Sequence, residues 1–165
     1  MRAPITRFPN LALAPIRTLT RGERSLALAM VVSGLSGGLI AFMLVIRLDP
    51  EAFFLRGLSL YELWVVLSGG IGTTAALHVM RHRIGRRGAI GAILSLAGVS
   101  LLAGLIGGSL AMPLYGTMFG PFLLVVTLAG QPLLALLWCI NLGAVRVLLC
   151  RWQGERDSIF AVRAR

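Results

Sequence analysis

The sequence of 165 residues has few charged side chains. It contains no lysine, and its 16 cationic residues are all arginine. Only 13% of the residues are charged, whereas 57% are apolar, and the mean hydropathy is +0.86. A soluble domain has roughly a quarter of its residues charged, so this chain has too few charges to cover a surface exposed to water. The composition therefore argues against a soluble globular enzyme and a disordered chain.

Residues that form catalytic or metal centres are also scarce. His78 and His82 are the two histidines, and their spacing places both on one helical face, where a metal can bind. No third or fourth ligand is obvious, so we assign them to a basic rim formed with the neighbouring arginines. Cys139 and Cys150 are about 16 Å apart along an ideal helix, which is too far for a disulfide. We expect no metal, no cofactor and no enzymatic activity.

Long apolar runs are what the sequence has in abundance. A membrane-spanning helix needs about 20 predominantly apolar residues, and its backbone must satisfy its own hydrogen bonds. Four runs qualify, at about 25–46, 60–80, 89–112 and 119–145. The sequence therefore predicts an all-α fold, an integral membrane four-helix transmembrane bundle over 25–149. An arginine-rich segment, 1–24, precedes it and a polar tail, 150–165, follows it.

The arginines predict the orientation of these spans. Five precede the first span, four lie between the second and third, and five lie at the end of the fourth and in the tail, which makes 14 of 16 on one side. Positive charge collects on the cytoplasmic side, so both termini are expected there, in the inner membrane of a bacterium. We expect the arginines to contact anionic lipid headgroups rather than nucleic acid.

Two helix starts carry a capping-box pattern, in which a hydroxyl residue is followed three positions later by glutamate. The pairs are Thr20 with Glu23, and Ser59 with Glu62. Residues 49–51, Asp-Pro-Glu, predict the start of a short helix at the outer surface.

Small residues spaced by four indicate where the helices pack. Lipid removes the hydrophobic drive for association, and small residues let helix backbones approach closely. The expected packing residues are Gly34, Gly38, Ser68, Gly72, Gly104 and Gly108. The third span is the richest in such residues, so we expect it to be the central helix or to meet another protein.

The interior of the expected fourth span has the one unusual polar feature. Pro132 predicts a kink near mid-membrane, with Gln131 and Asn141 placing amides in the hydrocarbon. Broken helices form substrate sites in transporters, whereas buried amides also hold bundles together. The spans contain no Asp, Lys or Arg, and their one acid, Glu62, lies in a first turn. This argues against a proton-coupled pump.

Two functions remain. The first is a small non-catalytic accessory or assembly subunit that packs against a larger membrane complex. It follows from the small size, the packing glycines and the absence of an ionisable group deep in the spans. The second is a homo-oligomeric channel or carrier for a small solute, with a substrate-binding site at Gln131, Pro132 and Asn141.

Overall fold

The computed structural model describes residues 20–48, 59–84 and 89–163. Every regular element in these ranges is a helix: α1 (Arg21–Leu48), α3 (Leu60–Ile84), α4 (Ala89–Ala111), α5 (Tyr115–Gly130) and α6 (Pro132–Arg163). In this part of the chain, four helices are long and apolar enough to span a membrane, namely α1, α3, α4 and α6. The predicted all-α class and the four long apolar helices are thereby confirmed. The helix expected at 49–51 lies outside the described residues.

Both capping boxes form as expected. At the start of α1, the Thr20 N–H donates to the Glu23 carboxylate at 2.9 Å, and the Glu23 N–H donates to Thr20 Oγ1 at 3.2 Å. At the start of α3, the Ser59 N–H donates to Glu62 at 2.5 Å, and the Glu62 N–H donates to Ser59 Oγ at 3.3 Å. Each pair satisfies two backbone donors that a helix start leaves unpaired, which fixes where the helix begins.

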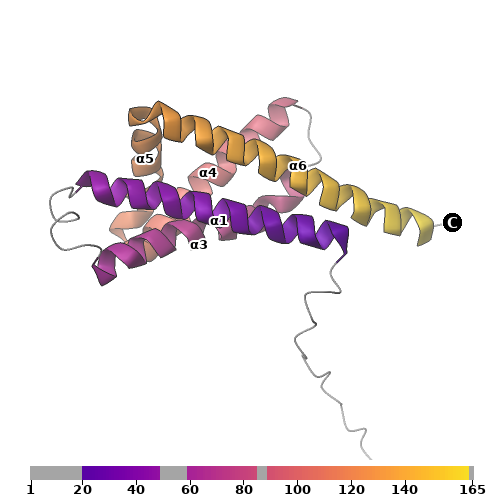
Figure 1. Ribbon diagram of the computed structural model, residues 1–165, viewed down its shortest axis with the longest axis horizontal. Coiled ribbons are helices and arrows are strands. Elements are labelled where there is room, and N and C mark those ends of the chain that lie inside the picture. The colour runs from indigo at the N-terminus through magenta and orange to yellow at the C-terminus, as the bar shows by residue number, and fades with distance from the viewer. Residues whose placement is uncertain (1–19, 49–58, 85–88, 164–165) are drawn as a thin grey trace, which may run out of the picture.

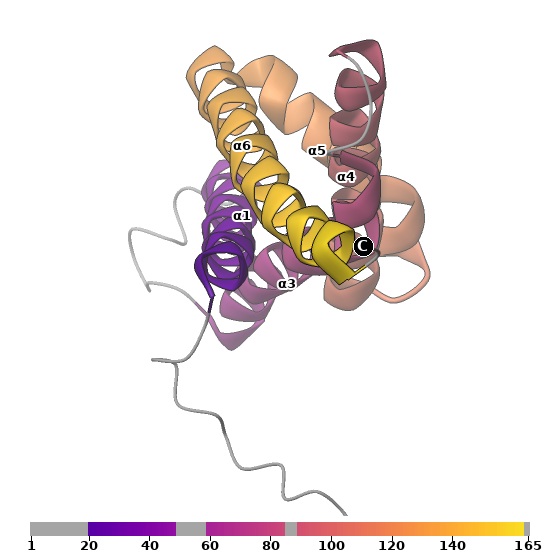
Figure 2. The same cartoon turned by 90° about the vertical axis from the view of Figure 1, so that its right-hand side faces the viewer.

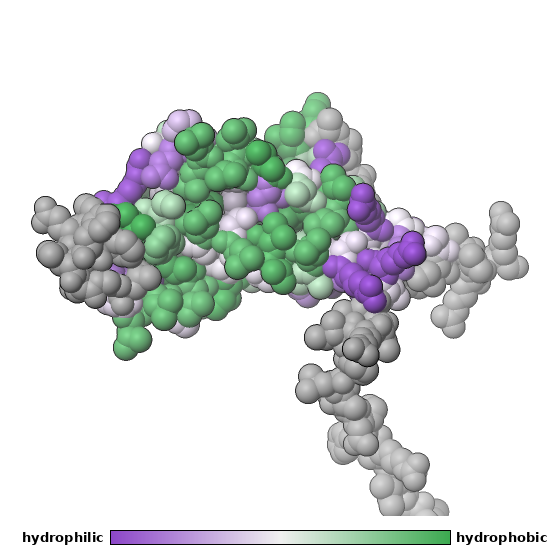
Figure 3. Space-filling view, in the orientation of Figure 1, coloured by the Kyte–Doolittle hydropathy of each residue, from purple (hydrophilic) through white to green (hydrophobic). Residues whose placement is uncertain are grey.

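The long helices form a bundle with two chemically different ends (Figure 1). Helix α3 packs between α1 and α4, while α6 packs mainly against α1 and α5 packs mainly against α4. The start of α1 and the end of α6 lie at one end of the bundle (Figure 1). Apolar side chains cover most of the length between the ends in the view of Figure 3. The helix with long helices on both sides is therefore α3, whereas the glycine-rich α4 lies between α3 and the shorter α5. The alternative expectation for α4, contact with another protein, stays a prediction.

The expected fourth span, 119–145, is divided into two helices. Gln131 separates α5 from α6 with φ −136° and ψ 88°, and Pro132 is the first residue of α6. Proline lacks the N–H needed to continue the series of helical backbone hydrogen bonds, and it disfavours helical geometry in the residue before it. The helix therefore ends at this point, where only a kink was expected. The apolar helix of spanning length is instead Pro132–Ser158.

Helix α5 lies across one end of the bundle, and it does not run parallel to the long helices (Figure 2). Its 16 residues cover about 24 Å, less than the thickness of a hydrocarbon core. A tight turn precedes it, in which the Tyr115 N–H donates to the Pro113 carbonyl at 3.0 Å and Leu114 has φ 73° and ψ −62°. This positive-φ γ-turn is a strained conformation that folds α5 back onto α4.

The expected packing residues all lie against a neighbouring helix. Gly34 and Gly38 of α1 face α3, Ser68 and Gly72 of α3 face α4, and Gly104 and Gly108 of α4 face α5. The approach is closest where backbones touch. A Cβ at Gly72 would lie 2.7 Å from the Cα of Gly107, and one at Gly108 would lie 2.9 Å from the Cα of Gly120. These crossings hold the helices at distances that no larger residue permits.

Candidate ligand-binding cavity

The helix break at Gln131 lies beside the last turn of α1. Arg47 donates from Nη2 to the Gly130 carbonyl at 3.1 Å. With its amide turned so that the oxygen faces Arg47, Gln131 accepts from Nε at 2.8 Å and from Nη2 at 3.3 Å. The guanidinium thus supplies a donor to a backbone carbonyl at the end of α5 and also binds the side chain of Gln131. Gln131 therefore lies at the end of the bundle where α1 finishes, and not midway along the long helices.

Asn141 lies elsewhere, inside the bundle. It is nine residues after Pro132, about 14 Å along α6, and only 7% of it is exposed. Neither its amide nitrogen nor its amide oxygen has a hydrogen-bond partner among the described residues. The structure therefore separates Asn141 from Gln131 and Pro132, and these three residues do not converge on one site.

A cavity of about 460 Å³ lies between α1, α3, α4 and α5. Helix α5 contributes the wall at one end, and Trp138 of α6 also lines it. Seven glycines line the cavity where its helices cross, and a Cβ at each of them would meet atoms of the facing helix: Gly37, Gly69, Gly104, Gly107, Gly108, Gly116 and Gly120. The spacing of these glycines can be read from the sequence, but it predicts only that helices pack there. It does not show on which side of a helix crossing a cavity stays open.

The polar groups of the cavity are few and unevenly placed. Inside it, the Ser68 hydroxyl donates to the Val65 carbonyl at 2.7 Å, and the Thr73 hydroxyl donates to Gly69 at 2.8 Å. Because these hydroxyl protons bond within α3, they are not offered to the cavity. Tyr61, Glu62 and Tyr115 also line it, and they belong to the first turns of α3 and α5. The cavity is thus apolar along its walls and polar where α3 and α5 begin.

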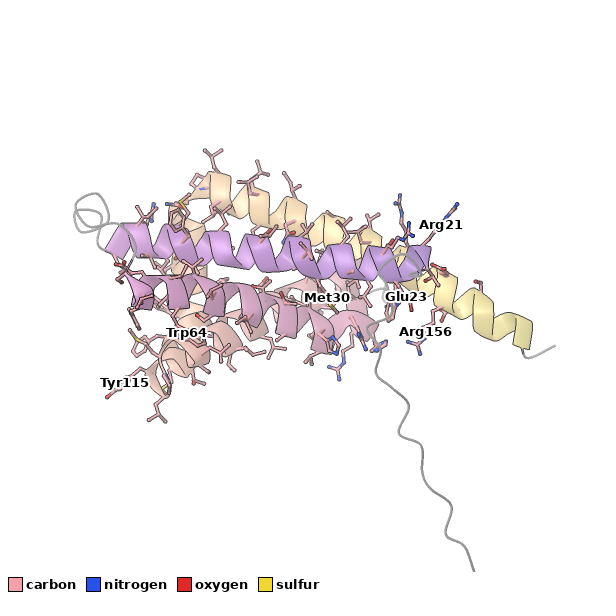
Figure 4. The ribbon with its side chains drawn as sticks, turned by 60° about the horizontal axis from the view of Figure 1, so that its bottom comes forward. Arg21, Glu23, Met30, Trp64, Tyr115 and Arg156 are labelled. Carbon is pink, nitrogen blue, oxygen red and sulfur yellow. The ribbon has the colours of Figure 1, made fainter. Side chains whose placement is uncertain are left out.

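We name the two ends of the bundle after the side chains that are found there. Tyr61, Trp64 and Tyr115 mark the aromatic end, where α3 and α5 begin, and Arg21, Arg81 and Arg156 mark the arginine end. Figure 4 shows Trp64 and Tyr115 at one end and Arg21 and Arg156 at the other. At the aromatic end, Trp64 Nε1 donates to the Leu110 carbonyl at 2.9 Å, which ties α3 to α4 beside the cavity.

The histidines lie at the arginine end, in the basic rim expected for them. Arg81 contacts His78 Nδ1 at 3.4 Å and His82 Nε2 at 3.3 Å. Within the described ranges, no group of three or more His, Cys, Asp or Glu side chains is placed to hold a metal ion. Cys139 and Cys150 are both free thiols on the exposed surface of α6.

No family model, curated protein or solved structure matches this chain. We therefore infer function from the cavity, the helix surfaces and the charge distribution of the chain itself.

Proposed function

We propose that this chain is a multi-pass protein of a bacterial inner membrane that binds an amphipathic, lipid-like molecule in the cavity between α1, α3, α4 and α5. The observation that carries the proposal is the combination of apolar walls with a polar mouth at the aromatic end. Its volume, about 460 Å³, falls within the usual range for small-molecule sites, roughly 300–1,000 Å³. No catalytic step is part of this function.

The distribution of charged and aromatic residues supports membrane insertion with both termini cytoplasmic. Arginines gather at the end where α1 begins and α6 ends, as the positive-inside rule requires of a cytoplasmic side. Tyr61, Trp64 and Tyr115 gather at the opposite end and are 49%, 44% and 73% exposed. Amphipathic rings favour the headgroup layer, so this end suits the outer interface.

A hydrocarbon chain fits the walls of the cavity because it needs no hydrogen-bond partner. Val65, Leu44 and Leu124 are among the side chains that would contact it. Water is a poor occupant, since it needs two to four polar partners, and apolar cavities of this kind stay dry. At the mouth, the Tyr61 and Tyr115 hydroxyls and the Glu62 carboxylate can bond a polar headgroup. The helix break at Gln131 offers no comparable pocket, which favours the cavity over the break as the binding position.

The test compares two valine-to-tryptophan variants by native mass spectrometry of the protein released from nanodiscs of native lipid. Val65 lines the cavity, whereas Val126 is 47% exposed and lines neither that cavity nor the groove between α1 and α3. Val65→Trp should fill the cavity and lower the bound fraction of the retained molecule at least ~10-fold, about 1.4 kcal/mol of binding free energy. Val126→Trp should retain it as the parent does. If both variants retained the small molecule equally, the result would contradict the proposal.

A second function, an accessory subunit of a larger complex, is favoured by a separate groove. This groove lies between α1 and α3, has a volume of about 1000 Å³, and has Gly34, Gly38 and Gly70 in its walls. Exposed apolar side chains also line the groove, among them Val31, Leu35 and Ile71, so it suits an apolar helix of a different membrane protein. The same spectra distinguish this function, because they would show a stoichiometric protein partner together with, or in place of, a small molecule.

A further inference from the structure

The division of the chain at Gln131 brings one arginine inside the length that α6 needs to span a membrane. Because α6 begins at Pro132, about 20 residues of it are needed to cross 30 Å of hydrocarbon, and these extend to about Arg151. Arg146 lies five positions before that point, whereas the span expected from the sequence, 119–145, ended just before it. Arg146 thus belongs to the last part of the span and not to its flank.

The packing of α6 gives a similar depth for Arg146. Its neighbour Val145 belongs to the buried cluster that contains Ala29 of α1 and Leu77 of α3. Ala29 is about 12 Å from the start of α1, and Leu77 is about 10 Å from the end of α3. Trp152, whose ring lies against α3 at the arginine end, follows Arg146 by six positions, about 9 Å. The three helices therefore place Arg146 about 10 Å inside the arginine end.

Within the described ranges, Arg146 forms neither a hydrogen bond nor an ion pair, although its side chain is half-buried. The chain has six acidic residues, and the four that the structure describes are Glu23, Glu62, Glu155 and Asp157. The nearest of them along α6 is Glu155, nine positions after Arg146, and its carboxylate lies beside Gly22 of α1. A charged side chain within the hydrocarbon is costly unless it is paired.

The two acids outside the described residues are too far along the chain to pair with Arg146. Asp49 and Glu51 follow the last residue of α1, Leu48, by one and three positions, so even an extended chain keeps them within about 11 Å of it. Leu48 is about 28 Å along α1 from Ala29, which marks the depth of Arg146. The anionic group that Arg146 needs must therefore come from another molecule.

The side of α6 that carries Arg146 is open and is formed by small residues. Cys139, Gly143, Arg146 and Cys150 are separated by four, three and four positions, so they lie on one side of the helix, which we call the Arg146 face. The other three residues of this face are exposed, and nothing lies within 4 Å of a Cβ at Gly143. A second helix can therefore approach α6 closely beside Arg146.

We propose that the Arg146 face binds a transmembrane helix of a different membrane protein, and that a carboxylate side chain of that helix pairs with Arg146. A guanidinium and a carboxylate match each other in two parallel charge-assisted hydrogen bonds. A second copy of this chain does not fit, because two copies in one orientation would bring Arg146 against Arg146. The inference rests on the membrane insertion of the proposed function, but the Arg146 face contributes no residue to the cavity or to the groove between α1 and α3.

The test measures the binding of a synthetic membrane helix to the full chain in phosphatidylcholine vesicles. The probe is a leucine–alanine helix of about 22 residues with one glutamate about 10 Å from its end, and a matched peptide has glutamine at the same position. Energy transfer from the tryptophans of the protein to a dansyl group on the peptide reports association. Flotation of the vesicles shows whether the protein is inserted.

The glutamate peptide should bind the parent protein at least ~10-fold more tightly than the glutamine peptide does. Arg146→Gln should remove this difference, whereas Arg151→Gln, which changes an exposed arginine of the same helix, should preserve it. Gly143→Ile should weaken the binding of both peptides, because its side chain would occupy the open side of the Arg146 face.

Equal binding of the two peptides by inserted parent protein overturns this inference alone. A second arm counts phosphatidylglycerol retained from nanodiscs by native mass spectrometry. If Arg146→Gln lowers this count and Arg151→Gln does not, while the peptides bind equally, the counter-charge is a lipid phosphate and no helix partner is needed. A protein that does not float with the vesicles contradicts membrane insertion, and with it both this inference and the proposed function.

Discussion

Replacing Gly104 and Gly108 together by isoleucine is expected to prevent α5 from packing on α4, with loss of the folded protein. A Cβ at Gly104 would lie 2.9 Å from the Cα of Pro121, and one at Gly108 would meet the Gly116 carbonyl oxygen. The obstructing atoms belong to the backbone, so no side chain can rotate out of the way. Overpacking of a core costs about 1–3 kcal/mol, and a backbone clash at two positions should exceed that.

The measurement is the yield of monodisperse protein in detergent, followed by thermal unfolding of what remains. Gly143→Ile is the matched control, because nothing lies within 4 Å of a Cβ at Gly143 on the exposed surface of α6. This control should purify and unfold like the parent protein. A double variant that matches Gly143→Ile in yield and midpoint would show that α4 and α5 do not cross at these glycines.

Replacing Asn141 by leucine is expected to stabilise the protein. Asn141 is 7% exposed, and its amide nitrogen and oxygen have no partner among the described residues. An unsatisfied buried polar group costs about 1–3 kcal/mol, and leucine removes that cost while keeping a similar size. We expect a gain of about 2 kcal/mol, which raises the unfolding midpoint by about 4–8 °C in a chain of this length.

Cys139→Leu is the control for this comparison, because Cys139 lies on the same helix and is exposed. Its midpoint should change little, as a surface substitution usually stays within about 0.5 kcal/mol. If Asn141→Leu lowers the midpoint instead, the amide has a partner in the folded protein, such as a buried water, and a polar role for Asn141 deep in the bundle is established.

The parts of the fold that follow from local pattern could be predicted from the sequence. Apolar runs gave the long helices, and the capping pairs at Thr20 and Ser59 form as expected. Both depend on residues a few positions apart. The division at Gln131 was expected only as a kink, because a proline alone does not show whether the helix resumes in the same direction.

The candidate sites could not be predicted because they depend on residues far apart in the chain. Arg47 donates to the carbonyl of Gly130, which lies 83 positions later in the chain. His82 and Trp152 lie against each other from separate helices, which spacing along the sequence does not reveal. The cavity could be predicted only by knowing the direction of α5, because α5 forms one of its walls. That direction is determined by the turn at Leu114.

The most direct test of the account is a map of the protein in native-lipid nanodiscs, determined by electron cryomicroscopy with a bound antibody fragment to add mass. The account predicts elongated density between α1, α3, α4 and α5, continuous from the mouth at Tyr61 and Tyr115 toward Thr127, and absent from the Val65→Trp protein. A map in which α5 closes onto α3 and leaves no space between the helices would contradict it.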